Sequence, residues 1–93
     1  MPSHFAFAVS FEQLLGAIGK LNEHGIETRG FDGRVSREPS VIGWMPSAQV
    51  YFRDPDGHSL EFITFLRDAP SPGFNESYSE WKELVERQGG RAT

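Results

Sequence analysis

Apolar and polar residues alternate most clearly in residues 47–65, where two alternating segments flank a turn. The turn, Asp54–Gly57, has proline where a type I turn needs a fixed φ and glycine where the chain then needs a positive φ. This combination is typical of a three-residue hairpin loop with a bulge, closed by Asp54 opposite His58. We therefore predict a β-hairpin here.

The hairpin register assigns each residue to one face of the predicted sheet, because side chains alternate along a strand. One face is wholly apolar and must be buried; it carries Val50, Phe52, Leu60 and Phe62. The opposite face is mainly polar and carries the opposed pairs Arg53–Ser59, Tyr51–Glu61 and Gln49–Ile63. The mid-strand carboxylate of Glu61 indicates either a solvated face or a binding site.

Residues 4–9 alternate in the same way and are predicted to form a strand. Its apolar face consists of Phe5, Phe7 and Val9, and its other face of His4, Ala6 and Ala8. The segment Ser10–Gln13 matches a capping box, so we expect a helix from there to about His24, ended by Gly25. We expect the helix to cover both apolar faces with Leu14, Leu15, Ile18 and Leu21. This leaves His4 and Glu61 on the uncovered face of the same sheet.

The remaining segments are less regular. We predict a short strand from Ile26 to about Phe31 and a long loop over residues 32–47, rich in Gly, Pro and charge. A loop of that length is usually functional or poorly ordered; its Trp44 and Met45 either anchor it on the sheet or cover a ligand. Residues 69–73 are predicted to be a linker, followed by a second helix from about Ser77 to Gly89-Gly90. The apolar stripe of that helix is Tyr78, Trp81, Leu84 and Val85.

The predicted order is strand, helix, strand, strand, strand, helix. It indicates an α+β fold: a βαβββ module with a curved mixed sheet, one covering helix and a C-terminal helix. We assign residues 1–68 to the module and residues 69–93 to a linker and a helix that packs on the module or on a dimer partner. A helix on one face leaves the other face bare and the sheet edges open. A second copy would close the cup, so we predict a homodimer.

Composition narrows the classes of partner. A chain of 93 residues holds one domain, and 38% hydrophobic with 13% aromatic residues suits a globular protein. The formal charge is −4 with scattered basic residues, so we expect neither nucleic acid nor membrane as a partner. There is no cysteine, and neither a spanning apolar segment nor a signal peptide is expected. We predict a cytoplasmic location by elimination.

His4 and Glu61 are the best candidates for a shared site, because the first and last predicted strands place them on the same face. Imidazole and carboxylate together suit Zn, Fe, Mn, Co or Ni. Catalytic metals usually have three protein ligands, and a twofold axis would double these two. The alternative is an ordinary histidine at a strand start, with Glu61 partnered by Tyr51, Arg53 or Gln49. His24 is explained by the helix dipole, and His58 by the hairpin end.

Residues 50–63, VYFRDPDGHSLEFI, together with the strand at 4–9 and a helix ending at His24–Ile26, resemble the vicinal oxygen chelate superfamily. That superfamily includes glyoxalase I, bleomycin-resistance proteins, extradiol dioxygenases and fosfomycin-resistance thiol transferases. The resemblance covers about residues 4–66. It implies that two βαβββ modules form a U-shaped site around a divalent metal, with ligands at the positions of His4 and Glu61. It also implies that Tyr51 lies beside the substrate.

Most members of the superfamily have two modules, and this chain has one, most like the carboxy-terminal module. Either a homodimer completes the site or the chain is a shortened version of a longer protein. We expect a metal-dependent lyase, isomerase, thiol transferase or dioxygenase acting on a small oxygen-rich substrate, with Glu61 as metal ligand and base. Trp44, Tyr51 and Arg53 are the expected substrate contacts. The alternatives are a metal-free sequestering protein, whose dimer groove holds a flat or amphipathic compound between Trp44, Tyr51 and Phe65, and an inactive single module.

Overall fold

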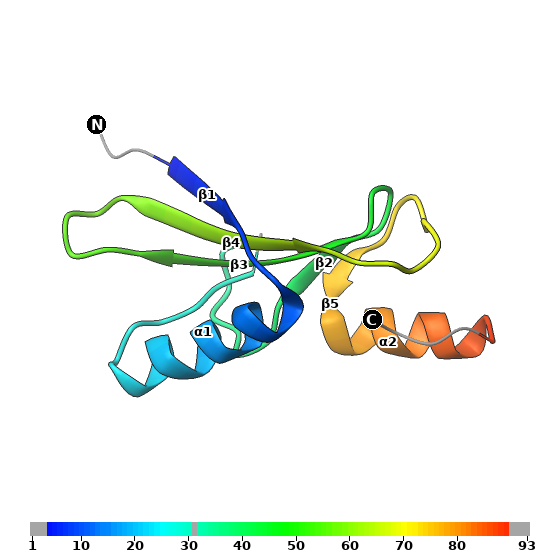
Figure 1. Cartoon of the computed structure of the whole chain (residues 1–93), viewed down its shortest axis with the longest axis horizontal. Coiled ribbons are helices and arrows are strands. Elements are labelled where there is room, and N and C mark those ends of the chain that lie inside the picture. The colour runs from blue at the N-terminus through cyan, green and yellow to red at the C-terminus, as the bar shows by residue number, and fades with distance from the viewer. Residues whose placement is uncertain (1–3, 31, 90–93) are drawn as a thin grey trace.

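Five strands form one open sheet in the computed structural model, which describes residues 4–30 and 32–89, and two helices lie on one side of that sheet (Figure 1). His4 is described at its backbone only. The elements are β1 (His4–Ala8), α1 (Phe11–Glu23), β2 (Ser40–Ile42), β3 (Ser47–Arg53), β4 (Ser59–Phe65), β5 (Asn75–Ser77) and α2 (Tyr78–Arg87).

The strand order is β1-β4-β3-β2-β5, with β1 parallel to β4 and every other pair antiparallel. The predicted α+β fold with a mixed sheet is therefore confirmed. The hairpin register is confirmed as well, since Tyr51 pairs with Glu61 and Arg53 with Ser59. The amide of Asp54 donates to the carbonyl of His58 at 3.1 Å, and Gly57 has a φ of 84°. The turn sequence alone was sufficient to fix this register.

The predicted strand at residues 26–31 is wrong. Only Arg29 in this segment pairs with the sheet, through a single bridge to Tyr51, and Phe31 lies outside the described residues. The strand beside β3 is instead β2, inside the predicted loop, and β5, which pairs with β2, lies just after the predicted linker at residues 69–73. Strands of three residues are too short to display an alternating pattern, so the sequence gives no periodic signal for them.

Helix α1 begins at the predicted capping box, where the Ser10 hydroxyl accepts from the Gln13 amide and the Gln13 side chain accepts from the Ser10 amide. Leu14 and Ile18 are buried against the sheet. The prediction that α1 covers β1 is wrong, because Phe5 and Phe7 remain 47% and 48% exposed. The two rings lie on the expected face, opposite Leu60 and Phe62, but β1 is an edge strand that α1 does not cover.

One hydrophobic core joins both helices to the sheet. The buried cluster contains Leu14, Ile18, Val41, Ala48, Val50, Leu66, Trp81 and Val85. Trp81 of α2 is buried, its indole N–H donates to Asp68 at 2.7 Å, and its ring meets Phe74 with a centroid separation of 5.0 Å. A carboxylate also caps α2 from outside the helix, since Glu38 accepts from the Ser79 amide at 2.7 Å. These contacts tie residues 74–85 to the same core as α1.

Candidate functional site

The sheet register lines up side chains in rows across the face of the sheet that the helices leave uncovered, which we call the helix-free face. The first row contains the positions of His4, Ser59 and Arg53. The second row contains Ala6, Glu61, Tyr51 and Arg29. The third row contains Ala8, Ile63, Gln49 and Ser40. Strands β1, β4 and β3 thus bring most of the predicted site residues into two adjacent rows.

Glu61 and Tyr51 form the centre of the second row. Glu61 is 9% exposed, so its carboxylate lies largely out of solvent. Burial, and then the charge and hydrogen bond of Glu61, raise the pKa of Tyr51 to about 12. Tyr51 is therefore a neutral phenol at physiological pH, and its hydroxyl donates to the Glu61 carboxylate. Of the three partners predicted for Glu61, the structure pairs it with Tyr51.

His4 begins β1 opposite Ser59, in the row next to Glu61. A strand spacing of about 4.8 Å and a two-residue rise of about 6.6 Å put the Cα atoms of His4 and Glu61 roughly 8 Å apart. Both positions belong to the helix-free face by strand parity. The side chain of His4 lies outside the described residues, so its role as a metal ligand stays a prediction.

Arg53 and Arg29 flank Tyr51 on the same face. Arg53 ends β3 and is exposed, and its role as a substrate contact stays a prediction. Arg29 was not among the predicted site residues, because the segment around it was treated only as a short strand. The signal was nevertheless present, since alternation over residues 26–30 sets Glu27 and Arg29 apart from Ile26 and Thr28.

Gln49 occupies the third row and was not predicted as a site residue. It is only 1% exposed, and its side-chain Nε2 donates to Ser47 Oγ at 2.5 Å. Its Oε1 is buried and has no hydrogen-bond partner among the described residues. A buried acceptor without a donor is costly, so this oxygen marks a polar position beside the Tyr51–Glu61 pair.

Trp44 lies away from the other site residues. It is 64% exposed in the turn between β2 and β3, whereas Tyr51 is near the opposite end of β3. The idea that Trp44 anchors the loop on the sheet is therefore wrong within one chain. Trp44, Met45 and Phe65 form an exposed apolar group at this end of the sheet, which we call the end patch. The groove between Trp44, Tyr51 and Phe65 was predicted for a dimer and stays a prediction.

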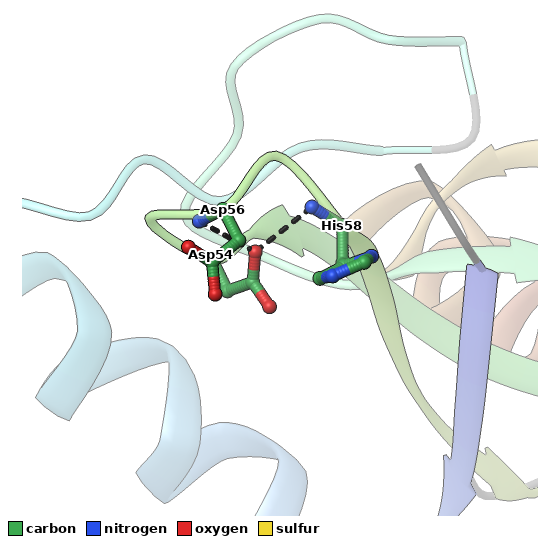
Figure 2. Close-up of side chains that lie close together, drawn as sticks. All are labelled: Asp54, Asp56 and His58. Atoms are coloured by element: carbon green, nitrogen blue, oxygen red, sulfur yellow. Dashed lines mark hydrogen bonds between the residues drawn. The ribbon is translucent and has the colours of Figure 1, made fainter. Parts of the chain in front are cut away.

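The hairpin tip brings Asp54, Asp56 and His58 together, with potential ligand atoms within 4.8 Å of one another (Figure 2). The Asp54 carboxylate already accepts from the amides of Asp56 and His58, at 3.0 and 2.8 Å. It therefore stabilises the turn, and the grouping is explained by the loop conformation. The ring of His58 meets Phe5 edge-on, with a centroid separation of 5.9 Å.

His24 ends α1 with its Nδ1 2.8 Å from the Lys20 carbonyl, in agreement with its predicted structural role.

No helix among residues 4–30 and 32–89 has the length and apolar character needed to cross a membrane.

No protein-family model matches the chain, and no curated protein matches its sequence. Two solved structures are similar to it. An integron cassette protein from the mobile metagenome of the Halifax Harbour sewage outfall shares 29% identity over 70% of this chain, with a TM-score of 0.57. The oxidase ChaP-H2 shares 31% identity over 78% of this chain, also with a TM-score of 0.57.

The chain spans about half the length of both similar proteins, covering 49% of the integron cassette protein and 55% of ChaP-H2. Over most of its described residues it therefore shares the fold of one part of two longer proteins, one of which is named as an oxidase.

Proposed function

We propose that this chain is a vicinal oxygen chelate module that contributes half of a divalent-metal enzyme site, completed by a second copy. The observation that supports this most directly is the position of Glu61. It is a largely buried carboxylate in the middle of β4, hydrogen-bonded by Tyr51 and one row from the start of β1. The likeness to an oxidase and the VYFRDPDGHSLEFI resemblance support the same family.

The donor set fits a divalent metal. The Tyr51 hydroxyl is a neutral donor, so it leaves the negative charge of Glu61 available to a cation. Carboxylate from Glu61 and imidazole from His4 suit Zn, Fe, Mn, Co or Ni. When bound, such a metal would act as a Lewis acid on substrate oxygens. Tyr51 would orient the Glu61 carboxylate through its single O–H, and Glu61 would hold the site's negative charge and accept a proton. The substrate class that this chemistry favours is a small oxygen-rich compound.

The open edge of the sheet supports a second copy as the missing half. Strand β1 is the last strand on its side of the sheet, so its outer edge pairs with no strand among the described residues. It carries Phe5 and Phe7, both about half exposed. Exposed edges with large apolar side chains are usually covered in stable proteins. A copy joined along β1 would bury both rings and set a second His4 and Glu61 beside the first pair.

Native mass spectrometry with metal analysis tests this proposal, on protein purified without chelator or affinity-tag metal. We expect a homodimer that carries one divalent ion. The ion should be lost in His4→Ala and in Glu61→Gln, while His24→Ala and Glu83→Gln, which change exposed residues outside the rows, should retain it. A dimer that binds no divalent metal would refute the metal site, and a folded monomer would refute the shared one.

A metal-free binding protein of the bleomycin-resistance kind is the second candidate, and the exposed end patch favours it. In that case a flat apolar compound would bind near Trp44 without any metal. Its binding would quench the fluorescence of Trp44, while the signal of the buried Trp81 would persist in Trp44→Phe. Saturable quenching by aromatic compounds in a metal-free dimer would favour this function over the enzyme.

A further inference from the structure

A cavity of about 200 Å³ opens beside Tyr51 on the helix-free face. Its lining consists of Arg29, Gly30, Gly33, Tyr51, Phe52, Arg53 and Ser59. Two of these residues are arginines, and none of the described residues that line the cavity is acidic. The whole chain has 13 acidic and 9 basic residues. The cavity therefore has the opposite charge to the protein as a whole.

We infer that Arg29 and Arg53 form an anion subsite that binds the carboxylate or phosphate group of a small ligand. This deepens the proposed function and rests on it for the identity of the ligand's other end. The two guanidinium groups are the charged elements of the subsite, and Tyr51 and Ser59 supply neutral hydroxyl groups in the same lining.

Arg29 is held by the sheet although it belongs to no strand. Its amide donates to the Tyr51 carbonyl at 2.7 Å, and the Tyr51 amide donates back to the Arg29 carbonyl at 2.9 Å. This pair of hydrogen bonds fixes the Arg29 backbone beside Tyr51 in the second row. The guanidinium Nη1 then donates to the Gly33 carbonyl at 2.7 Å. Arg29 is thus a positioned cation, whereas a cation on an unpaired loop would lack these restraints.

The ion pair of Arg29 leaves it available to a ligand. Its Nη2 lies 3.5 Å from Glu27 Oε1, and the two side chains are 44% and 63% exposed. Exposed pairs of this kind contribute little stability, so a ligand anion can replace Glu27 at small cost. A guanidinium also has five N–H donors, more than the contacts to Gly33 and Glu27 require.

Arg53 reaches the same cavity from the next row. It lies two residues beyond Tyr51 on β3, so Arg29 and Arg53 are diagonal neighbours with backbone positions about 7–8 Å apart. Two arginine side chains over that spacing span a single carboxylate or phosphate, the groups that guanidinium binds best. An anion between them also relieves the repulsion between two like charges.

The position of the subsite limits the chemical class of ligand that it can bind. Tyr51 belongs both to the cavity lining and to the hydrogen bond with Glu61. A ligand anchored at the arginines therefore directs its remaining oxygens toward Glu61, about one row away, or roughly 7 Å. The chemical class is a small carboxylic or phosphoric acid that carries a second oxygen function a few bonds from the acid group.

Titration of chelator-treated, metal-free protein with inorganic phosphate and with malonate tests the subsite, using amide chemical shifts as the readout. We expect saturable binding of at least one of the two anions. Affinity should fall about tenfold or more in Arg29→Gln and in Arg53→Gln, because each loses a charge-assisted hydrogen bond. Arg37→Gln makes the same charge change outside this cavity, next to Leu15, and should leave the affinity unchanged. The anion that binds identifies the acid group of the ligand.

Three results would overturn the subsite: saturable binding of neither anion, unchanged affinity in the Arg29 and Arg53 variants, or an equal loss of affinity in Arg37→Gln. Circular dichroism checks that the exposed substitutions leave the fold intact. The test is separate from that of the metal site, because it uses metal-free protein. Anion binding in a protein that never takes up metal supports the subsite and refutes the metal centre. Metal uptake together with unchanged anion affinity in the Arg29 and Arg53 variants supports the metal centre and refutes the subsite.

Discussion

Tyr51 acts as a hydrogen-bond donor on the helix-free face, because burial and then the neighbouring Glu61 both disfavour its phenolate. Its proton is retained through the whole physiological range, so Tyr51 orients the Glu61 carboxylate and does not serve as a base. The facing of this pair followed from the sequence, since a single turn fixes the register of β3 and β4. The burial of Gln49 could not be predicted from the sequence. Strand alternation assigns a side chain to a face, but its exposure depends on the neighbouring strands and loops.

The raised pKa of Tyr51 predicts a loss of stability in alkaline solution. The phenol has a pKa of 10.0 in the unfolded chain and about 12 in the folded protein. Its contribution to the free energy of unfolding is therefore fully present below pH 10 and is lost as the pH rises toward 12. Absorbance at 295 nm during a pH titration of Tyr78→Phe, which leaves Tyr51 as the remaining tyrosine, should show ionisation well above pH 10. Ionisation near pH 10 in folded Tyr78→Phe would contradict the buried hydrogen bond.

Gln49→Met tests the unpartnered oxygen on the third row. Methionine has a similar volume and removes a buried acceptor that lacks a donor. We expect the free energy of unfolding to rise by up to about 1 kcal/mol, because removing the unsatisfied buried acceptor outweighs the loss of the hydrogen bond from Nε2 to Ser47. The exposed Gln88→Met, at the end of α2, should change it little. Urea denaturation measures both. A clear loss of stability in Gln49→Met would contradict this expectation and would mean that the hydrogen bonds of Gln49, including the one to Ser47, stabilise the fold.

At the scale of elements, the sequence predicted the longer helices and strands whose boundaries are marked by local signals. The hairpin and α1 were predicted because a Pro-Asp-Gly turn and a capping box encode their boundaries in adjacent residues. Strands β2 and β5 are three residues each and exist through pairing with one another and with β3. The pairing of β5 with β2 joins residues far apart in sequence, and strands of three residues are too short to display an alternating pattern. Arg29 is joined to the sheet in a similar way, by a bridge to Tyr51, which lies far from it in sequence.

Gly43 tests the packing of the predicted linker. Its amide donates to Phe74 at 2.9 Å and its carbonyl accepts from Ser71 at 2.8 Å, so residues 71–74 lie directly against it. A Cβ at Gly43 would overlap the Ser71 carbonyl oxygen and the Phe74 side chain. We expect Gly43→Ala to destabilise the protein by about 2 kcal/mol or more, since the obstacle is backbone.

Gly16→Ala is the matched control for this change. A Cβ there meets nothing within 4 Å, and Gly16 lies inside α1. Alanine has the higher helix propensity, so thermal unfolding should show a gain of about 0.5–1 kcal/mol. If Gly43→Ala were as stable as the wild type, residues 71–74 would not be packed on the β2–β3 turn in solution.

At the scale of the whole molecule, the large apolar side chains exposed among the described residues include two separate groups. One is the pair Phe5 and Phe7 on β1, on the side of the sheet that faces α1, and the other is the end patch of Trp44, Met45 and Phe65. A single chain leaves both in solvent. The proposed shared site requires pairing at β1, whereas a ligand-sequestering protein would use the end patch. The second copy would therefore cover β1 in the enzyme and the end patch in the sequestering protein.

Substitution of one aromatic residue in each region separates these arrangements. We expect Phe7→Glu to shift the protein to a monomer at micromolar concentration, because pairing along β1 would bury a charge in an apolar contact. Trp44→Glu should leave the dimer intact. Both side chains are already about half or more exposed, at 48% and 64%, so neither change should unfold the chain.

Analytical ultracentrifugation measures the association of these two variants, and metal analysis of the same samples links the association to the metal site. Because each copy would supply one His4 and one Glu61, the Phe7→Glu monomer should lose its metal even though both ligands remain in its sequence. A monomer that still binds metal tightly would show that a single chain is sufficient for the site, and a dimer lost only in Trp44→Glu would move the interface to the end patch.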